Sequence, residues 1–391
     1  MFKNSKNLNS YILPILLFSM IWGAIEFLLP IYLSQAEMSV TFISILFAII
    51  SILSIILDIP IGKLSDIIGR KKLILYSMIV SAIALIILYK FSSIYAYILS
   101  AILIGIAYGL NWSPLLAFVG DKTKEYNRGR IFGTYFSLES FGEAISPLVL
   151  VLIIYFTNLR FPFLVLALLA LVSVLMFSRI NETVKKRLYY VKKIYQYFSF
   201  KSCLSLIKKS THLNLFILTS GFFTAFFWQS VWFSQPLIGF YEDSILNSAL
   251  IVAAFSLPTI LLSKFLGCLI DKVESKIFYL YSIFSVIISF LLFYLISSIV
   301  AKIIFIFFAA IGVLGIKLTI NVLVVRLFKS EHRGEFFGII ETIKDIAYAI
   351  TPLFIGFSYK LIGLDGIFIA NSTFALLLFT FGFKILKNKS I

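Results

Sequence analysis

The chain is a series of long apolar stretches separated by short polar breaks. Twelve stretches, bounded by Pro, Gly or charged residues, approach the roughly 20 apolar residues that a membrane helix needs. Hydropathy places the first six near residues 11–33, 40–61, 73–90, 95–118, 131–155 and 161–180. It places the second six near residues 213–235, 244–264, 277–298, 302–326, 335–359 and 366–384. The pattern therefore predicts an all-α membrane protein with twelve transmembrane helices.

The composition requires lipid around most of this surface. Of the 391 residues, 61% are hydrophobic and 13% are charged, whereas soluble domains are about half apolar and a quarter charged. A water-soluble globule could not bury so much apolar surface. The two cysteines, Cys203 and Cys268, are too few for a disulfide scaffold or a Cys-rich metal centre. We expect no metal and no cofactor.

Basic residues predict the organisation and the orientation. Residues 181–212 contain eight of the lysines and arginines and form a basic, partly amphipathic linker at the cytoplasmic membrane surface, between six-helix bundles at 1–180 and 213–391. With both termini in the cytoplasm, six of the 34 basic residues are not on the inside: Lys90, Arg160, Lys302 and Lys360 lie outside, and Lys317 and Lys344 lie within spans. The positive-inside rule therefore favours this orientation in the cytoplasmic membrane. The net charge of +16 needs no nucleic acid partner to explain it.

The first span resembles a secretory signal peptide in two respects. Lys3 and Lys6 precede the apolar run, and Ser34-Gln35-Ala36 has the small-x-small form of a cleavage site. The run is too long for a signal-peptide core, however, and it contains Glu26. We therefore predict that it is retained as a permanent helix.

The chain also matches itself at a constant offset of 205 residues. In the first half the matching residues are Gly62, Leu64, Asp66, Gly129, Phe132, Gly133, Pro147 and Leu148. Their counterparts are Gly267, Leu269, Asp271, Gly334, Phe337, Gly338, Pro352 and Leu353. The repeat predicts two pseudo-symmetric six-helix halves in the same orientation, related by an axis along the membrane normal.

Ionisable residues indicate which spans meet water, because such groups are costly in a bilayer and normally face a cavity or a partner. The third, sixth, ninth and twelfth spans contain none in their interiors and are predicted to face lipid. The charges and tryptophans of the other spans predict one polar, aromatic path between the halves. The charged residues are Glu26, Asp58, Glu139, Glu143, Lys317, Glu341, Lys344 and Asp345, and the tryptophans are Trp22, Trp112, Trp228 and Trp232.

A specific motif follows the second span, where the chain reads Gly62-Lys63-Leu64-Ser65-Asp66-Ile67-Ile68-Gly69-Arg70-Lys71-Lys72. We interpret it as a loop in which Gly62 and Gly69 permit tight turns and Asp66 can cap a helix and pair with Arg70. The segment resembles the G-x-L-[AS]-D-x-x-G-R-[KR] signature of the major facilitator superfamily. A degenerate second copy, Gly267-Cys268-Leu269-Ile270-Asp271, strengthens the resemblance.

This resemblance covers essentially the whole chain, and among the superfamily's members it points to the drug and metabolite efflux permeases. It implies the superfamily's fold, with Asp66, Arg70 and Lys71 in a cytoplasmic charge cluster with the acidic residue ending the fourth span, here Asp121. In the family this cluster latches the two halves, and Gly267 and Asp271 would be its second copy. The alternative is a solvated loop that acts only as a stop signal.

The sequence departs from the family at two places. The fifth span partly resembles the superfamily's antiporter motif, G-x8-G-x3-G-P-x2-G-G: Gly133, Gly142 and Pro147 match, whereas Ser146 replaces the third glycine. The fourth span lacks the family's usual membrane arginine and has Ala101 there. Both departures weaken the inference of antiport by the family's arginine-assisted proton route.

Glu26 is the first candidate for proton or substrate binding. It lies four residues after Trp22 on the same helical face, and loss of hydration at that depth suits reversible protonation. A structural hydrogen bond is the alternative. Asp58 lies near the cytoplasmic end of its span, so gating is as good an expectation as proton binding. Glu139 and Glu143 form an i,i+4 pair whose repulsion would be relieved by protonation or by a basic partner.

In the second half, Glu341 and Asp345 share a helical face, and Lys317 lies at a depth similar to that of Asp345. A functional Lys317–Asp345 pair and a purely structural bridge are equal hypotheses. The spans contain six acids against two bases, so an acidic, aromatic cavity would favour cations and amphipathic organic molecules over phosphorylated anions.

Other functions find less support. The chain has two histidines and no G-x-x-x-x-G-K-[ST] phosphate loop, so we predict no enzyme activity and no direct use of ATP. We predict a monomeric secondary transporter that moves a small organic solute by alternating access, with proton-coupled efflux of a lipophilic or cationic compound. Uptake or facilitated exchange of a sugar or other small metabolite is the alternative. A non-transporting membrane sensor or assembly factor is a remote one.

Overall fold

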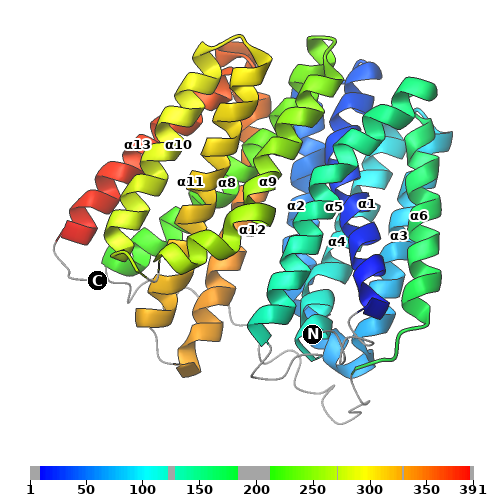
Figure 1. Ribbon diagram of the computed structural model, residues 1–391. Coiled ribbons are helices and arrows are strands. Elements are labelled where there is room, and N and C mark those ends of the chain that lie inside the picture. The colour runs from blue at the N-terminus through cyan, green and yellow to red at the C-terminus, as the bar shows by residue number, and fades with distance from the viewer. Residues whose placement is uncertain (1–8, 122–127, 184–211, 271, 328–329, 388–391) are drawn as a thin grey trace. The chain divides into compact units, whose positions relative to one another are not determined.

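The computed structural model describes residues 9–121, 128–183, 212–270, 272–327 and 330–387, and its regular structure is α-helical. The first six helices are α1 (Asn9–Gln35), α2 (Val40–Ile68), α3 (Arg70–Lys90), α4 (Ile94–Asp121), α5 (Arg128–Phe156) and α6 (Phe161–Ser178). The other six are α8 (His212–Tyr241), α9 (Ile245–Ile270), α10 (Ser275–Leu295), α11 (Ile299–Leu327), α12 (Ser330–Ile362) and α13 (Gly366–Lys387), as Figure 1 shows. The chain divides into two compact units, Met1–Phe198 and Ser199–Ile391.

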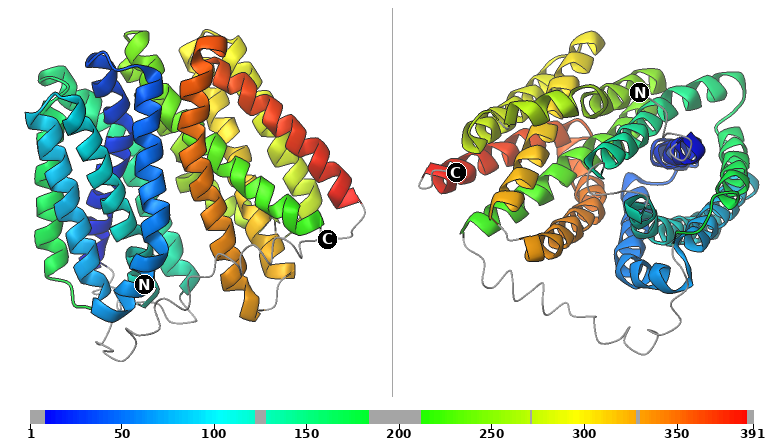
Figure 2. Two further views of the ribbon diagram at one scale, coloured as in Figure 1. Left: turned by 180° about the vertical axis from the view of Figure 1, so that it is seen from behind. Right: turned by 60° about the horizontal axis from the view of Figure 1, so that its bottom comes forward.

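The helices repeat at the offset found in the sequence. The helices α2, α3, α4 and α6 begin at residues 40, 70, 94 and 161, and α9, α10, α11 and α13 begin 205 residues later, at 245, 275, 299 and 366. In each unit the first helix packs on the fifth, the second and third pack on the fourth, and the third packs on the sixth. Figure 2 shows these helices side by side within each unit. The prediction of two equivalent six-helix halves is confirmed.

Eleven of the described helices are long and apolar enough to cross a membrane. The described helix outside this set is α12, whose middle contains Glu341, Lys344 and Asp345. The most enclosed spans are those of α1 and α8, in whose apolar windows 78% and 72% of the residues are buried. The four helices expected to face lipid, α3, α6, α10 and α13, are 39–50% buried, which is also the range of α2, α4, α9 and α11. Burial within the units therefore does not distinguish them.

Small residues let α1 and α5 approach closely. A Cβ added at Gly23 of α1 would lie 2.6 Å from Ser146 Oγ and 2.8 Å from Glu143 Cα of α5. A Cβ added at Gly142 of α5 would lie 2.7 Å from Ser19 Cβ of α1. Ser146 stands where the antiporter motif has a glycine, and it faces a glycine on the partner helix. Close helix contact is kept because Gly23 supplies the space that the serine takes.

The prediction that residues 62–68 form a loop is wrong. Helix α2 continues through them to Ile68, and the chain turns at Gly69, which has a φ of 105°. Residues other than glycine rarely adopt this backbone conformation. Gly62 is tolerated inside a helix at a cost of roughly 1 kcal/mol, so only the second glycine of the motif ends the helix.

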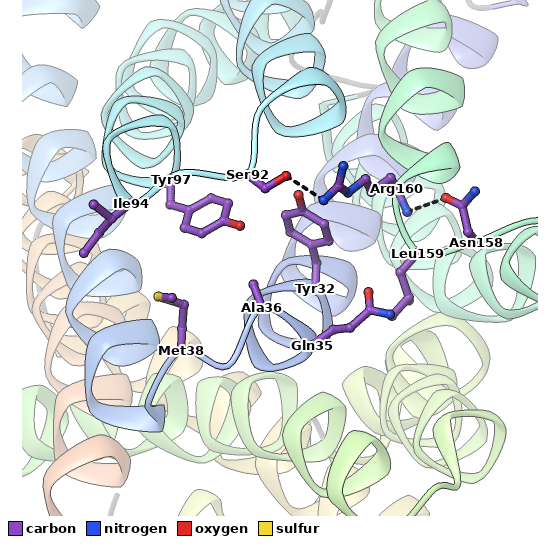
Figure 3. Close-up of a pocket in the computed structure, with 10 residues that line it drawn as sticks. All are labelled: Tyr32, Gln35, Ala36, Met38, Ser92, Ile94, Tyr97, Asn158, Leu159 and Arg160. Atoms are coloured by element: carbon purple, nitrogen blue, oxygen red, sulfur yellow. Dashed lines mark hydrogen bonds between the residues drawn. The ribbon is translucent and has the colours of Figure 1, made fainter.

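One pocket of unit 1 lies beside the start of α2 (Figure 3), whereas Gly69 follows the other end of that helix. Its volume is about 580 Å³, and residues at the end of α1, in the α1–α2 turn and in the α3–α4 and α5–α6 connections line it. Among them are Tyr32, Ser92, Tyr97 and Arg160. With the orientation predicted from the basic residues, this pocket is on the outer side of the membrane.

Candidate functional site

Glu26 lies in the membrane span of α1 and is half-buried. Its Oε1 accepts a hydrogen bond of 2.9 Å from the Tyr108 hydroxyl of α4. The Tyr108 ring packs against Trp22, with ring centroids 3.9 Å apart, and Trp22 is 5% exposed. No basic side chain among the described residues pairs with Glu26. A carboxylate whose neighbours are a neutral hydroxyl and aromatic rings is poorly compensated when ionised in a membrane, so it is suited to accept a proton or an organic cation.

Two further polar atoms on the same two helices lack hydrogen-bond partners in the described structure. They are Trp22 Nε1 and Asn111 Oδ1, and both are buried. Asn111 lies three residues after Tyr108 on the same face of α4. Because buried polar groups are almost always hydrogen-bonded, these atoms are candidate contacts for water or for a solute. Tyr108 and Asn111 were not predicted from the sequence, although an Asn within an apolar span was a usable signal.

The two α5 carboxylates are placed differently from each other. Glu139 accepts a hydrogen bond of 3.0 Å from Tyr135 one turn earlier, and Tyr135 is buried. Glu143 lies where α5 meets Gly23 of α1. Asp58 is half-buried on α2 and is remote in sequence from both. Each of the three carboxylates has a polar or electrostatic interaction in the structure.

In unit 2 the hypothetical pair of Lys317 and Asp345 does not form among the described residues. Lys344 Nζ instead lies 2.6 Å from Glu341 Oε1, one turn away on α12. The Lys344 side chain is 12% exposed and that of Glu341 is 59% exposed. Depth along a span gave no information on the direction in which each side chain leaves its helix, and that direction decides the pairing.

Buried neutral polar side chains of α8 and α13 were also missed. Asn371 Nδ2 of α13 donates a hydrogen bond of 2.6 Å to Ser230 Oγ of α8. Three oxygens on these two helices are buried and lack partners among the described residues: Ser234 Oγ, Gln235 Oε1 and Asn371 Oδ1. Gln235 is 1% exposed. These amides and hydroxyls offer a solute both hydrogen-bond donors and acceptors without charge.

The four tryptophans occupy different environments. Trp232 is 1% exposed and stacks on Trp228 with ring centroids 6.4 Å apart. Its Nε1, like that of Trp22, is buried without a partner in the described structure. Trp112 and Trp228 are half-buried. Two of the tryptophans expected to line a cavity, Trp22 and Trp232, are therefore buried.

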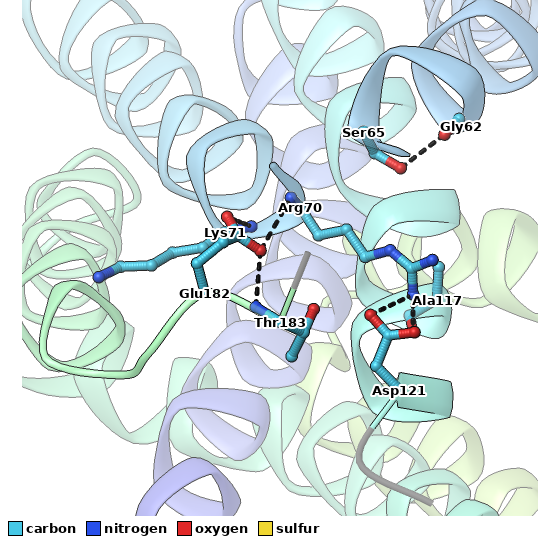
Figure 4. Close-up of polar contacts among 8 residues, drawn as sticks. All are labelled: Gly62, Ser65, Arg70, Lys71, Ala117, Asp121, Glu182 and Thr183. Atoms are coloured by element: carbon cyan, nitrogen blue, oxygen red, sulfur yellow. Dashed lines mark hydrogen bonds and ion pairs between the residues drawn. The ribbon is translucent and has the colours of Figure 1, made fainter. Parts of the chain in front are cut away.

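Arg70 of the motif at residues 62–72 meets the end of α4 (Figure 4). Arg70 Nη1 lies 2.7 Å from Asp121 Oδ2 and also donates to the carbonyl oxygen of Ala117. The structure thus brings together the arginine and the helix-4 carboxylate that the family resemblance pairs. The side chain of Asp66 and the whole of Asp271 lie outside the described residues.

Glu182, which follows α6, joins this end of unit 1 and was not predicted (Figure 4). Its two carboxylate oxygens accept the backbone N–H groups of Arg70 at 3.2 Å and of Lys71 at 3.1 Å. Lys71 Nζ donates in turn to the Ser178 carbonyl at 2.5 Å. The first N–H groups of a helix have no acceptor within it, so Glu182 caps α3. A side chain at Gly69 would overlap Glu182 Oε2, which is a second reason for glycine there.

Removing this cap should loosen the start of α3. We expect Glu182→Ala to cost about 0.5–2 kcal/mol, as for other lost caps, and Glu182→Gln to cost less because an amide oxygen still accepts hydrogen bonds. Hydrogen exchange of the peptide containing Arg70 and Lys71 should become faster in Glu182→Ala. Glu37→Ala, at an exposed carboxylate of the same unit, is the control. Unchanged exchange in Glu182→Ala would contradict the capping role.

Unit 2 has a related contact at the equivalent positions. The offset of 205 residues places Arg70 on Ser275 and Asp121 on Arg326. Arg326 Nη1 donates a hydrogen bond of 3.0 Å to Ser275 Oγ. The third and fourth helices of both units are therefore joined at the same two positions, with the arginine on opposite partners. Gly267, by contrast, has nothing within 4 Å of an added Cβ, so it makes no close helix contact.

The sequence matches the family model of the Major Facilitator Superfamily over residues 12–249 and 217–390. The chain therefore belongs to this superfamily. It is a multi-pass membrane transporter and not an enzyme. A comparison with curated proteins found no match.

Solved transporters share the fold along almost the whole chain. A mutant of the nucleoside transporter NupG has a TM-score of 0.76 and 14% identity, with 97% of this chain and 99% of that chain covered. A POT family transporter in complex with 5-aminolevulinic acid has a TM-score of 0.75 and 16% identity, with 95% and 94% covered. The human organic anion transporter MFSD10 (TETRAN) has a TM-score of 0.68 and 16% identity, with 96% and 98% covered. At these identities the likeness is one of fold alone.

Proposed function

We propose that this protein is a secondary transporter of the cytoplasmic membrane that exports a lipophilic or cationic compound in exchange for protons. It works as a monomer by alternating access, with both termini in the cytoplasm and a basic linker at 181–212 between its bundles. Arg70, Asp121 and their neighbours act in conformational gating. Glu26 binds the proton or the cation.

The observation that carries this proposal is the environment of Glu26. Its partner is the neutral hydroxyl of Tyr108, and Trp22 packs on that tyrosine. A proton and an organic cation would each neutralise the same carboxylate, so binding of one disfavours binding of the other. An aromatic neighbour adds cation–π attraction for the organic cation. Competition for one carboxylate is the simplest physical basis for exchange.

Efflux of ethidium from cells that make the protein tests the proposal. We expect faster efflux than from cells without it, and we expect a protonophore to remove the difference. Efflux equal to that of the empty cells, with the protein present in the membrane, would exclude a broad cation exporter. Efflux that persists with the protonophore would exclude proton coupling.

A second candidate, uptake or exchange of a neutral polar metabolite such as a sugar or nucleoside, is favoured by the buried, unpaired side-chain oxygens of Ser234, Gln235 and Asn371. The fold is shared with a nucleoside transporter, and unpaired buried amides suit hydroxyl-rich solutes. If this candidate is correct, Gln235→Leu should lower uridine or glucose uptake by about tenfold or more, because a solute group loses its buried partner. Uptake of labelled solute into proteoliposomes measures this. Wild-type uptake no faster than in protein-free vesicles would exclude the candidate.

A further inference from the structure

The outer pocket of unit 1 has a polar wall and an apolar wall (Figure 3). Ser92, Arg160 and the Tyr32 hydroxyl lie together on one side, and Ile94 lies on the other, with the Tyr97 ring directed into the space. A volume of about 580 Å³ is within the range of small-molecule sites. Glu26 does not line this pocket, so the role proposed for Glu26 does not account for it.

Arg160 supplies the positive charge of the polar wall. Its Nη2 donates a hydrogen bond of 2.5 Å to Ser92 Oγ. The backbone N–H groups of Arg160 and Phe161 donate to Asn158 Oδ1 at 2.9 and 3.0 Å, which fixes the turn that carries the arginine. Its Nε and Nη1 have no partner among the described residues. None of the described residues that line the pocket is acidic, so the guanidinium is available to an anion such as phosphate.

Exposed aromatic side chains flank the same connections. Phe91 precedes Ser92 and is 56% exposed, and Tyr95 follows Ile94 and is 81% exposed. Tyr155 and Phe156, just before the α5–α6 turn, are 81% and 75% exposed. Aromatic residues of membrane proteins gather at the level of the lipid headgroups. The flanking residues therefore place the pocket at headgroup depth.

We propose that this pocket binds the headgroup of an anionic phospholipid of the outer leaflet. The phosphate is held by Arg160 and Ser92, and the glycerol headgroup meets the Tyr97 hydroxyl and the Gln35 amide. The acyl chains leave past Ile94 into the bilayer. A zwitterionic lipid binds more weakly, because the lining offers no carboxylate for its ammonium group. The site is independent of the transported solute and of Glu26.

Native mass spectrometry of the purified protein with dioctanoyl phosphatidylglycerol tests this assignment. We expect Arg160→Gln to lower lipid binding by about tenfold or more, through loss of a charge-assisted contact. Arg160→Lys, which keeps the charge but not the bidentate hydrogen-bonding geometry, should lose less lipid binding. The control is Lys90→Gln, which removes the same charge from the same end of unit 1 at an exposed residue outside the lining. Its binding should stay within about twofold of wild type.

Three ligands distinguish the possible sources of the chemistry. Dioctanoylglycerol, which lacks phosphate, and dioctanoyl phosphatidylcholine should both bind more weakly than dioctanoyl phosphatidylglycerol. Equal binding of dioctanoylglycerol, or equal losses in Lys90→Gln and Arg160→Gln, would overturn the proposal. Equal binding of free glycerol 3-phosphate would make the ligand a soluble phosphate ester and would overturn the lipid assignment. If Arg160→Gln also lowers the thermal unfolding midpoint, lipid binding by Arg160→Lys is compared with lipid binding by Lys90→Gln. A larger loss of binding in Arg160→Lys supports the proposal, and equal losses overturn it.

Discussion

Replacing Glu26 with Gln is expected to reduce proton-driven transport to the level seen without the protein. Glutamine has nearly the same size, and its amide oxygen can still accept the hydrogen bond from Tyr108. The substitution therefore removes the titratable charge and little else. Because an exchanger that cannot load a proton cannot complete its cycle, solute should no longer move in response to a proton gradient. Ethidium movement in proteoliposomes with an imposed pH difference measures this.

Two further variants serve as comparisons for Glu26→Gln. Glu37→Gln removes a carboxylate at an exposed position beyond the end of α1 and should transport as wild type does. Tyr108→Phe removes the hydrogen-bond donor but keeps the ring, and should lower the rate by about tenfold while leaving it proton-dependent. Protonophore-sensitive efflux that survives in Glu26→Gln would remove Glu26 from the coupling step.

The second large effect is expected from Gly23→Val. A Cβ at this position would lie 2.6 Å from Ser146 Oγ and 2.8 Å from Glu143 Cα, and the second of these contacts is with backbone. Helices α1 and α5 would have to separate, which costs about 1–3 kcal/mol or more when a packed core is overfilled. The thermal unfolding midpoint in detergent should fall clearly, and less protein should reach the membrane.

Gly267→Val is the matched control for this packing effect. It makes the same substitution inside a helix, but nothing lies within 4 Å of the added Cβ. Its unfolding midpoint should stay close to that of wild type. Adding Ser146→Gly to Gly23→Val should restore part of the loss, because it removes the side-chain overlap but not the backbone contact. Equal midpoints for Gly23→Val and Gly267→Val would show that α1 and α5 do not pack as described.

The sequence predicted features that depend on distance along the chain. Span length and the offset of 205 residues predicted the twelve helices and their repetition, because hydropathy and helix rise are local properties. The family resemblance pointed to Arg70 and Asp121, which lie 2.7 Å apart. Features that depend on which faces meet were not predicted. Tyr108 reaches Glu26 across 82 positions and Glu182 reaches Arg70 across 112, and no periodicity in the chain reports such contacts.

The same limit applies to the hypothetical pair of Lys317 and Asp345. Both positions were placed by depth, which follows from counting residues, whereas pairing needs the two side chains to leave their helices toward each other. Ser146 shows the opposite case. By motif it is a departure from the family, but in the structure Gly23 compensates for it on the facing helix. A motif that is defined on one helix cannot detect a compensating residue on the helix that packs against it.

The contacts at Arg70 and Arg326 differ in what holds them. The first joins two charges, with side chains 15% and 31% exposed, and such a pair weakens as dissolved ions screen it. The second joins an arginine to a buried hydroxyl, so its acceptor carries no net charge for salt to screen. The repeat therefore has one ionic-strength-sensitive contact and one less sensitive contact at matching positions. Rising salt would act on the two units unequally, so the protein would carry a built-in asymmetry in its response to its ionic surroundings.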